Sequence, residues 1–345
     1  MTAPKLRFKE FDEGWSTSKI EEIAIVTSGG TPSRANERYW AGDIPWVTTS
    51  LVDFNVIQSA EEFITQEGLD NSSAKLFPQN TILMAMYGQG ITRGKVAILG
   101  IDATTNQACA AIKLKTNFDT QFIFQNLMNR YEEIRDLSNE GGQKNLSAGI
   151  IKEVEVNYPE KKEQAKIASF LSAVDEKISQ LNQKHRLLCE YKQGMMQKLF
   201  SQQLRFKADD GNEFGKWEEK KLHQIFQIKA GGDIDKSSVS QVRTSEFSYP
   251  IFANSDKNKG FYGWANKFKY KDAVTVTGRG NLGIAVARNE PFYPIVRLLV
   301  LLPLVKQNLK FFEEKINLLD IVSESTGVPQ LTAPQLSKYK VNVAL

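Results

Sequence analysis

Apolar residues recur alternately four and three positions apart along one stretch near the middle of the chain. The positions with this spacing are Ile167, Leu171, Val174, Ile178, Leu181, His185, Leu188, Lys192, Met195 and Leu199. A period of about 3.5 residues is typical of a helix whose apolar seam packs against another helix in a coiled coil. Because there is no proline and one glycine between Lys161 and about Gln203, we predict a single helix of roughly 65 Å. A core helix of a compact domain is the alternative, although such helices are usually shorter. We interpret His185 and Lys192 as polar seam positions that set the register.

Four short apolar stretches predict strands on either side of this helix. They pair around glycine-rich turns as residues 82–86 with 95–99, and 273–277 with 283–287. Residues 118–139 and 309–322 have the pattern of helices. Each half of the chain outside the long helix is therefore predicted to be a small α+β domain.

The two halves share short segments in the same order. The matching pairs are residues 6–8 with 204–206, Trp15 with Trp217, 28–31 with 230–233, 142–148 with 327–333, and 156–157 with 341–342. Shared edges indicate a common way of docking, and the different interiors indicate two different recognised targets. We predict a first domain at residues 1–158, a coiled-coil helix at 159–203 and a second domain at 204–345.

Composition narrows the class of protein. The 345 residues are 41% hydrophobic and 24% charged, which is typical of a globular chain. The two cysteines, Cys109 and Cys189, are too few for a disulfide scaffold, and with two scattered histidines they do not have the spacing of a zinc site. The first residues lack the apolar core of a signal peptide, and the most apolar run, 295–305, is too short to span a membrane. We expect a cytoplasmic protein with no metal.

Charge is distributed unevenly along the chain. Residues 1–150 carry 14 basic and 18 acidic side chains, a net of −4, whereas residues 251–300 carry 8 basic and 3 acidic, a net of +5. The second half therefore has the stronger signature of a surface that binds a polyanion. An ordinary solvated surface is the alternative explanation.

Three motifs suggest enzymes, but their surroundings do not support that interpretation. Residues 278–283 match the glycine pattern of a dinucleotide-binding loop, yet β-branched residues follow instead of a helix that could hold a pyrophosphate. Residues 90–95 suggest a phosphate loop but have the wrong spacing. Residues 289–292 differ by Glu290 from the Asn-Pro-Pro-Phe loop of adenine methyltransferases, and no cofactor loop precedes them. We therefore predict no catalytic residues and no cofactor of the chain's own.

The glycine-rich turns carry side chains suited to nucleic acid. Arginine, glutamine, asparagine and threonine pair with base edges, and glycine lets the backbone approach a phosphate closely. The candidate DNA contacts are Tyr87, Gln89, Thr92, Arg93, Lys95, Asn254, Lys257, Lys259, Thr277, Arg279 and Asn281. Residues 254–264 also alternate cations with aromatic side chains. The alternative is ordinary turn chemistry, which accounts for the glycines better than for Arg93 or Arg279.

With these features the chain resembles the specificity subunit of a type I restriction-modification system. The resemblance covers nearly the whole chain and rests on residues 6–15, 28–32, 43–47, 139–146, 163–178 and 192–199. It implies that each variable domain recognises one half of a bipartite DNA target, while the conserved helices form an antiparallel coiled coil and dock two modification subunits. Those partners would hold S-adenosylmethionine and methylate adenine, and a separate motor-nuclease subunit would cut DNA. The resemblance thus implies that the chain has no active site because the chemistry belongs to the partner subunits.

One departure from the family concerns a second conserved helix after the second domain. The chain stops at Leu345, near the point where the first copy begins its helix, so we expect the distal helix to be absent. The seam, without its two polar positions, comprises Ile167, Leu171, Val174, Ile178, Leu181, Leu188, Met195 and Leu199. We expect it to pair with a second copy of the chain or to be covered by the modification subunit. The competing hypotheses are a coiled-coil scaffold whose repeated domains bind protein, and an autonomous DNA methyltransferase or nuclease.

Overall fold

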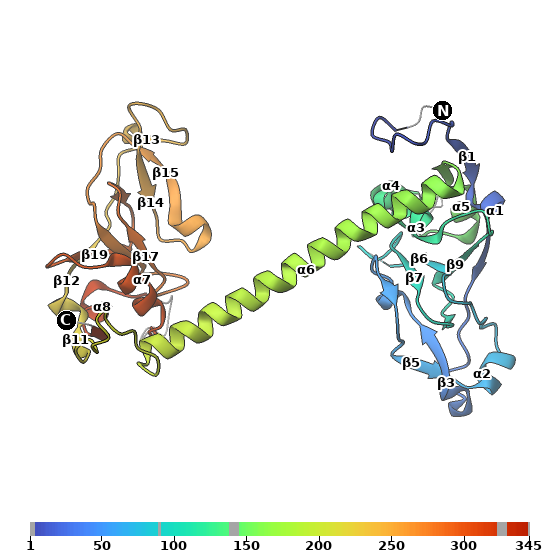
Figure 1. The fold of residues 1–345 in the computed structure, drawn as a ribbon, viewed down its shortest axis with the longest axis horizontal. Helices are drawn as coiled ribbons and strands as arrows, with labels where there is room; N and C mark the ends of the chain where they lie inside the picture. Colours follow the sequence, from blue (N-terminus) through green and yellow to red (C-terminus); the bar gives the residue numbers. More distant parts are fainter. Residues whose placement is uncertain (1–3, 89–90, 138–144, 323–329, 344–345) are drawn as a thin grey trace. The chain divides into compact units, whose positions relative to one another are not determined.

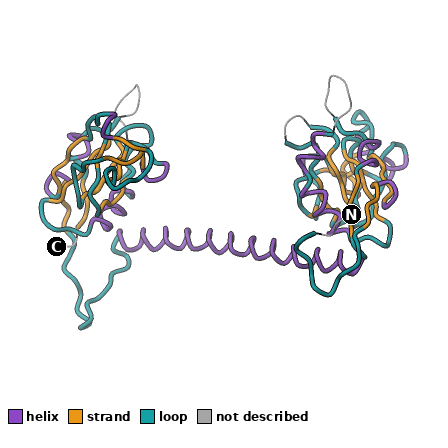
Figure 2. The backbone as a smooth tube through the Cα atoms, turned by 90° about the horizontal axis from the view of Figure 1, so that it is seen from above, coloured by secondary structure: helices purple, strands orange, loops and turns teal. Residues whose placement is uncertain are grey.

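The computed structural model describes residues 4–88, 91–137, 145–322 and 330–343. The chain divides into two compact units, residues 1–187 and 188–345, and the division lies inside the longest helix, α6 (Lys161–Phe200; Figure 1). In each unit, strands occupy the centre and are surrounded by helices and loops (Figure 2). None of the described helices is both long and apolar enough to cross a membrane.

Unit 1 contains a five-stranded sheet, a three-stranded sheet and a strand pair. The five-stranded sheet has the order β2 (Ala24–Ser28), β9 (Cys109–Leu114), β6 (Ile82–Ala85), β7 (Val96–Leu99) and β4 (Val56–Ile57). The three-stranded sheet has the order β5 (Glu62–Ile64), β3 (Trp40–Val47) and β8 (Thr104–Thr105), and the pair is β1 (Ser16–Lys19) with β10 (Glu155–Tyr158). Strands β6 and β7 are buried throughout, which explains why their sequences are continuously apolar.

Helices cover the apolar sheet of unit 1. They are α1 (Ile20–Ile23), α3 (Thr120–Asn129), α4 (Tyr131–Asp136), α5 (Ala148–Glu153) and the first part of α6. Helix α2 (Gln66–Asp70) lies instead beside the three-stranded sheet, where Leu69 packs against Trp46 and Ile64. Helix α3 begins where the side chain of Asp119 accepts a hydrogen bond from the amide of Phe122. Its buried residues join one core with strands β2, β6, β7 and β9 and with Ala168 of α6. The start of α6 is therefore part of the core of unit 1.

Unit 2 repeats this plan, but its two larger sheets have four strands each instead of five and three. One four-stranded sheet has the order β12 (Phe226–Ala230), β19 (Leu298–Pro303), β16 (Ala273–Thr277) and β17 (Ala285–Arg288). The other has the order β13 (Val239–Ser240), β15 (Phe261–Ala265), β14 (Tyr249–Phe252) and β18 (Tyr293–Pro294), and β11 (Glu218–Lys221) pairs with β20 (Lys340–Val343). Helices α7 (Leu309–Asn317) and α8 (Ala333–Leu336) complete the unit.

Short one-turn helices join several of these strands. In unit 1 they are η1 (Glu37–Tyr39) and η2 (Thr49–Leu51), and in unit 2 they are η3 (Leu222–Gln224), η4 (Lys236–Ser238) and η5 (Lys257–Gly260). Helix η5 includes Asn258 and Lys259 in the left-handed region, with φ of 46° and 50°. It therefore forms a tight turn between β14 and β15 rather than a regular helix.

The matching edges of the two halves have the same structural role. Each unit is closed by an antiparallel pair formed by its first and last strands, with Ser18 opposite Val156 in unit 1 and Lys220 opposite Val341 in unit 2. Val156 and Val341, which align in the sequence repeat, are both buried. The aligned segments 142–148 and 327–333 lie partly outside the described residues, but Ser147 and Thr332 within them both cap a helix, α5 and α8.

The predicted α+β class is confirmed, and the predicted strands and long helix are observed, whereas the two shorter predicted helices have different bounds. The two predicted hairpins are β6 with β7 and β16 with β17, and the predicted long helix is α6. The helix predicted at residues 118–139 is two helices, α3 and α4, and residues 138 and 139 lie outside the described residues. The helix predicted at 309–322 ends at Asn317.

Candidate nucleic-acid interface

The turn between β16 and β17 places Arg279 at the surface of unit 2. Asn254, from the loop after β14, accepts hydrogen bonds at Oδ1 from the amides of Gly278 (2.5 Å) and Arg279 (3.1 Å). Its Nδ2 donates to the carbonyl oxygen of Arg279 at 2.5 Å. The hydroxyl of Thr277 donates to the carbonyl oxygen of Asn281 (2.5 Å) and accepts from the amide of Ile284 (2.9 Å). The side chains of Asn254 and Thr277 thus hold the backbone of the turn between β16 and β17 in place.

The neighbouring turn, between β14 and β15, carries Lys257 and Lys259. Arg288 supports it from inside the unit, since its Nη2 donates to the carbonyl oxygen of Lys259 at 2.5 Å and its Nε donates to Thr275 Oγ1 at 3.1 Å. The guanidinium carbon of Arg288 also lies 3.5 Å from the centre of the Phe252 ring. Burial lowers the pKa of Arg288 to about 10, and the group is therefore still charged near neutral pH.

Positive charge gathers around these two turns. Lys257, Lys259 and Arg279 are exposed. Asp256 accepts a hydrogen bond from Asn281 Nδ2 at 2.5 Å, and this contact is the main cause of the lowered pKa of the Asp256 carboxyl. Asp256 lies in the turn between β14 and β15, and Asn281 lies in the turn between β16 and β17. Their hydrogen bond therefore links the two turns into one surface.

The corresponding turn of unit 1, between β6 and β7, has a different arrangement. Arg93 donates from Nε to the carbonyl oxygen of Arg135 at 3.1 Å, and Lys95 forms a 2.5 Å ion pair with Asp53. Tyr87 is 43% exposed, Thr92 is half-buried, and Gln89 lies outside the described residues. The cations of this turn are therefore engaged with the protein.

Ten of the eleven candidate DNA contacts lie in the described part of the chain, and they fall into two groups. Three of them expose a cation, namely Lys257, Lys259 and Arg279, and Tyr87 exposes a ring. The side chains of the others, Gln89 apart, lie half-buried or make contacts within the protein; these are Thr92, Arg93, Lys95, Asn254, Thr277 and Asn281.

Two cation–aromatic stacks were not predicted from the sequence. The guanidinium of Arg34 lies 3.7 Å from the centre of the Trp40 ring and also forms an ion pair with Glu62. In unit 2, Arg243 lies 4.9 Å from the centre of the Trp264 ring. Stacked arginines of this kind also contact bases and phosphates. Of these four residues, only Trp264 belonged to a pattern noted in the sequence, the alternation of cations and aromatic residues at 254–264.

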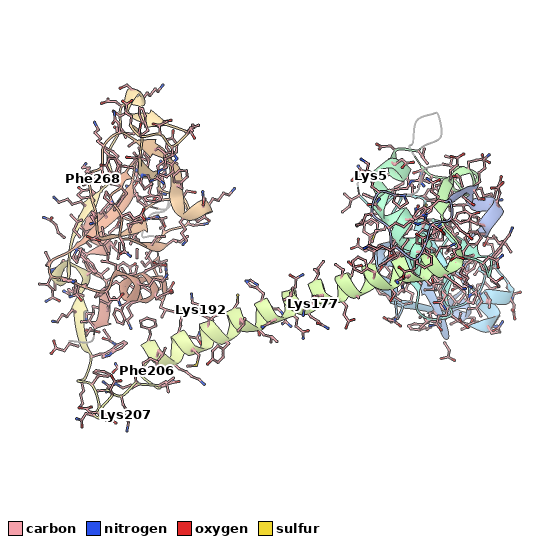
Figure 3. The ribbon with its side chains drawn as sticks, turned by 45° about the horizontal axis from the view of Figure 1, so that its top comes forward. Lys5, Lys177, Lys192, Phe206, Lys207 and Phe268 are labelled. Carbon is pink, nitrogen blue, oxygen red and sulfur yellow. The ribbon has the colours of Figure 1, made fainter. Side chains whose placement is uncertain are left out.

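Helix α6 exposes much of its apolar seam. Leu171, Val174, Ile178, Leu181 and Leu188 are 39–55% exposed, whereas Ile167, Met195 and Leu199 are half-buried. Figure 3 shows the side chains of Lys177 and Lys192 projecting from the helix along this stretch. Half-exposed leucine and isoleucine in a row are typical of a surface that meets another helix.

The described residues offer no grouping of three histidine, cysteine, aspartate or glutamate side chains that could hold a metal ion. Two hollows, one in each unit, have mainly apolar linings. One is lined in unit 1 by Leu6, Phe8, Trp15, Ile167 and Phe170, and another in unit 2 by Leu199, Leu204, Phe206, Trp217 and Phe311. Each is built around the repeated Leu-Arg-Phe segment and its tryptophan. Arg7 and Glu163 also line the first hollow, where they form an ion pair with each other. Arg205 lines the second hollow and donates to the carbonyl oxygens of Phe214 and Gly215. The charged groups of both linings are therefore engaged within the protein.

Comparison with known proteins identifies the family. The family model of the type I restriction modification DNA specificity domain matches residues 12–188 and 215–344. The type I restriction enzyme MjaIX specificity subunit of Methanocaldococcus jannaschii is 29% identical over 250 residues, which are 67% of this chain and 57% of that protein. The chain thus spans less than two thirds of the length of this curated relative.

Solved structures share the fold. The crystal structure of a type I restriction-modification system S subunit from M. genitalium superposes with a TM-score of 0.63 at 19% identity, covering 99% of this chain and 88% of that one. A chain from a structure on complex assembly and conformational transition of the type I system gives a TM-score of 0.57 at 13% identity, covering 96% of this chain and 86% of that one.

The chain therefore belongs to the type I restriction-modification specificity family, and the predicted resemblance is confirmed. Specificity subunits are the non-catalytic members of such systems, in agreement with the prediction that the chain is not itself an enzyme.

Proposed function

We propose that this chain is the sequence-specific DNA-binding subunit of a type I restriction-modification system, in which each unit recognises one half of a bipartite target. The observation that carries the proposal is that the DNA specificity domain model matches both units. The repeated sheet order, with a glycine-bearing turn at the same place in each unit, supports it. Divergent turns on a common frame are suited to two different half-sites.

The proposal assigns the chemistry to partners. Modification subunits would bind S-adenosylmethionine and methylate adenine at the site chosen by this chain, and a motor-nuclease subunit would cut DNA. The three segments 1–158, 159–203 and 204–345 would serve as first recognition domain, helix for subunit docking, and second recognition domain. A protein that acts on cellular DNA in this way would work in the cytoplasm.

The exposed seam of α6 has a proposed partner as well. A heptad seam fits a second seam of the same period, so a second copy of the chain is the occupant that best matches this surface. His185 and Lys192 would then be polar positions that favour one register.

DNA binding by the full chain with its modification subunit tests the proposed function. Binding of a duplex that carries the target should weaken steeply between about 50 and 200 mM salt, because lysine and arginine displace counterions from phosphates. The chain alone should neither bind S-adenosylmethionine nor methylate DNA. A complex without affinity for DNA would favour the protein-binding scaffold instead, and methylation by the isolated chain would favour an autonomous enzyme.

A further inference from the structure

The side-chain amide of Asn254 is almost fully engaged with the backbone of Gly278 and Arg279. Its oxygen accepts two hydrogen bonds, from the amides of Gly278 and Arg279, and its nitrogen donates to the carbonyl oxygen of Arg279. An amide oxygen has two lone pairs, and both are therefore used. Recognition of adenine by asparagine requires the same oxygen and nitrogen together. Asn254 is thus poorly placed to contact a base unless it leaves the turn.

Every backbone polar group of Gly278 and Arg279 that faces the unit has a partner. The carbonyl oxygen of Gly278 accepts a hydrogen bond from the amide of Leu331 at 2.9 Å. A side chain at position 278 would place its Cβ 2.7 Å from the carbonyl oxygen of Arg297 and 2.9 Å from that of Leu331. Glycine is required there by this close approach. The Cα of Arg279 is consequently held between β16, Asn254 and Leu331.

The side chain of Arg279, unlike its backbone, is not held by contacts of this kind among the described residues. It is exposed, and its guanidinium has no hydrogen-bond or ion-pair partner among the described residues. Arg93 differs, because it is half-buried and its guanidinium donates to Arg135. A fixed Cα with an exposed guanidinium is the arrangement that lowers the entropic cost of a bidentate contact.

We propose that Asn254 is a positioning residue for DNA specificity, which fixes the backbone of Arg279 so that the arginine can discriminate a base of the second half-site. This inference rests on the proposed function. Asp256 with Asn281, and Arg288 with the carbonyl oxygen of Lys259, keep the loop of Asn254 in place. The sequence pattern alone suggested Asn254 as a DNA contact; the geometry points to an action through Arg279.

A double-mutant cycle tests this role. The full chain with its modification subunit is titrated with the target duplex and with a duplex that has one substituted base in the second half-site. Asn254→Ala and Arg279→Ala should each lower the ratio of the two affinities by about fivefold to 150-fold. In the Arg279→Ala background, Asn254→Ala should cause no further loss. Asn266→Ala, at an exposed asparagine of the same unit, is the matched control.

Asn254→Asp guards against a variant that fails to fold. The carboxylate still accepts from both amides, but its second oxygen replaces a donor and repels the carbonyl oxygen of Arg279, so discrimination should fall in this variant as well while the loop keeps its polar anchor. The added charge acts equally on both duplexes and cancels in the ratio. Additive losses would overturn the inference in favour of a direct base contact, and unchanged discrimination in Asn254→Ala would also overturn it. If the unmodified complex does not discriminate the two duplexes, the proposed function itself fails.

Discussion

The backbone amide of Leu331 donates a 2.9 Å hydrogen bond to the carbonyl oxygen of Gly278, and the same bond of 2.9 Å joins Leu146 to Met86 in unit 1. In both units the acceptor follows the central strand of the hairpin, and the donor precedes the residue that caps a short helix. Leu146 and Leu331 are also buried in the cores of their units. The repeat in the sequence therefore preserves the contact that anchors each glycine-bearing turn.

Leu331→Ala is expected to destabilise unit 2 by about 2–5 kcal/mol, the usual cost of truncating a buried leucine. The backbone bond to Gly278 would remain, but its anchor in the core would be lost. Urea unfolding followed by fluorescence and circular dichroism should show an earlier transition for unit 2 alone. Val242→Ala removes an exposed side chain of the same unit and should change stability little.

The two arginines of the turns should behave differently when truncated. Arg279→Ala should weaken binding of the specific site by about 1–3 kcal/mol and leave thermal stability unchanged, because its guanidinium is exposed. Arg93→Ala should also lower the melting temperature, since it removes the hydrogen bond to Arg135. Binding titrations with substitutions in either half-site, together with calorimetry, measure both effects. Equal loss of affinity for all sequences would assign Arg279 to phosphate contact.

Replacing leucines of the α6 seam should weaken assembly without unfolding either unit. Burying two half-exposed leucines contributes roughly 1.5–3 kcal/mol, so Leu181→Glu with Leu188→Glu should weaken self-association by about tenfold to 100-fold. Light scattering across a concentration series gives the mass. Gln183→Glu, on the opposite side of the helix, is the control for added charge. A chain that stays monomeric before mutation contradicts the second-copy proposal, and covering of the seam by the modification subunit would then be tested with the same variants.

The two cysteines should react at very different rates with a thiol reagent. Cys109 is buried and Cys189 is exposed. Burial raises the pKa of the Cys109 thiol to about 11, although a hydrogen bond with Thr105 partly opposes this increase. One thiol of the native chain should react quickly at pH 8, and both should react in denaturant. A native chain in which both thiols react quickly would contradict the packing around Cys109.

The raised pKa of Cys109 also predicts a pH effect. Between about pH 9 and 11 the unfolded thiol ionises while the folded one keeps its proton, so stability should fall as pH rises, by at most about 2–3 kcal/mol. Urea titrations at both ends of this range should show a smaller fall in Cys109→Ala than in the unchanged chain. An identical fall would indicate that other groups cause it.

The sequence predicted those parts of the fold that depend on neighbouring residues. The seam spacing predicted α6, and continuous apolar runs predicted the two hairpins, because periodicity and burial are local signals. Partners far apart in the sequence had no such signal. Lys95 forms an ion pair with Asp53, and Asn254 accepts a hydrogen bond from the amide of Gly278. Neither contact produces a recognisable pattern in the sequence. The chemistry of the side chains was therefore enough to name candidate DNA contacts. The sequence could not show which of these side chains are exposed and which are bonded within the protein.

In the proposed function, this chain selects the DNA sequence that its partners methylate. Mapping of methylated bases across the genome of a strain with and without the gene tests it most directly. We expect adenine methylation at one bipartite motif to disappear with the gene. Replacing unit 2 with that of another specificity subunit should change only one half of the motif. An unchanged methylation map after loss of the gene would contradict the claim.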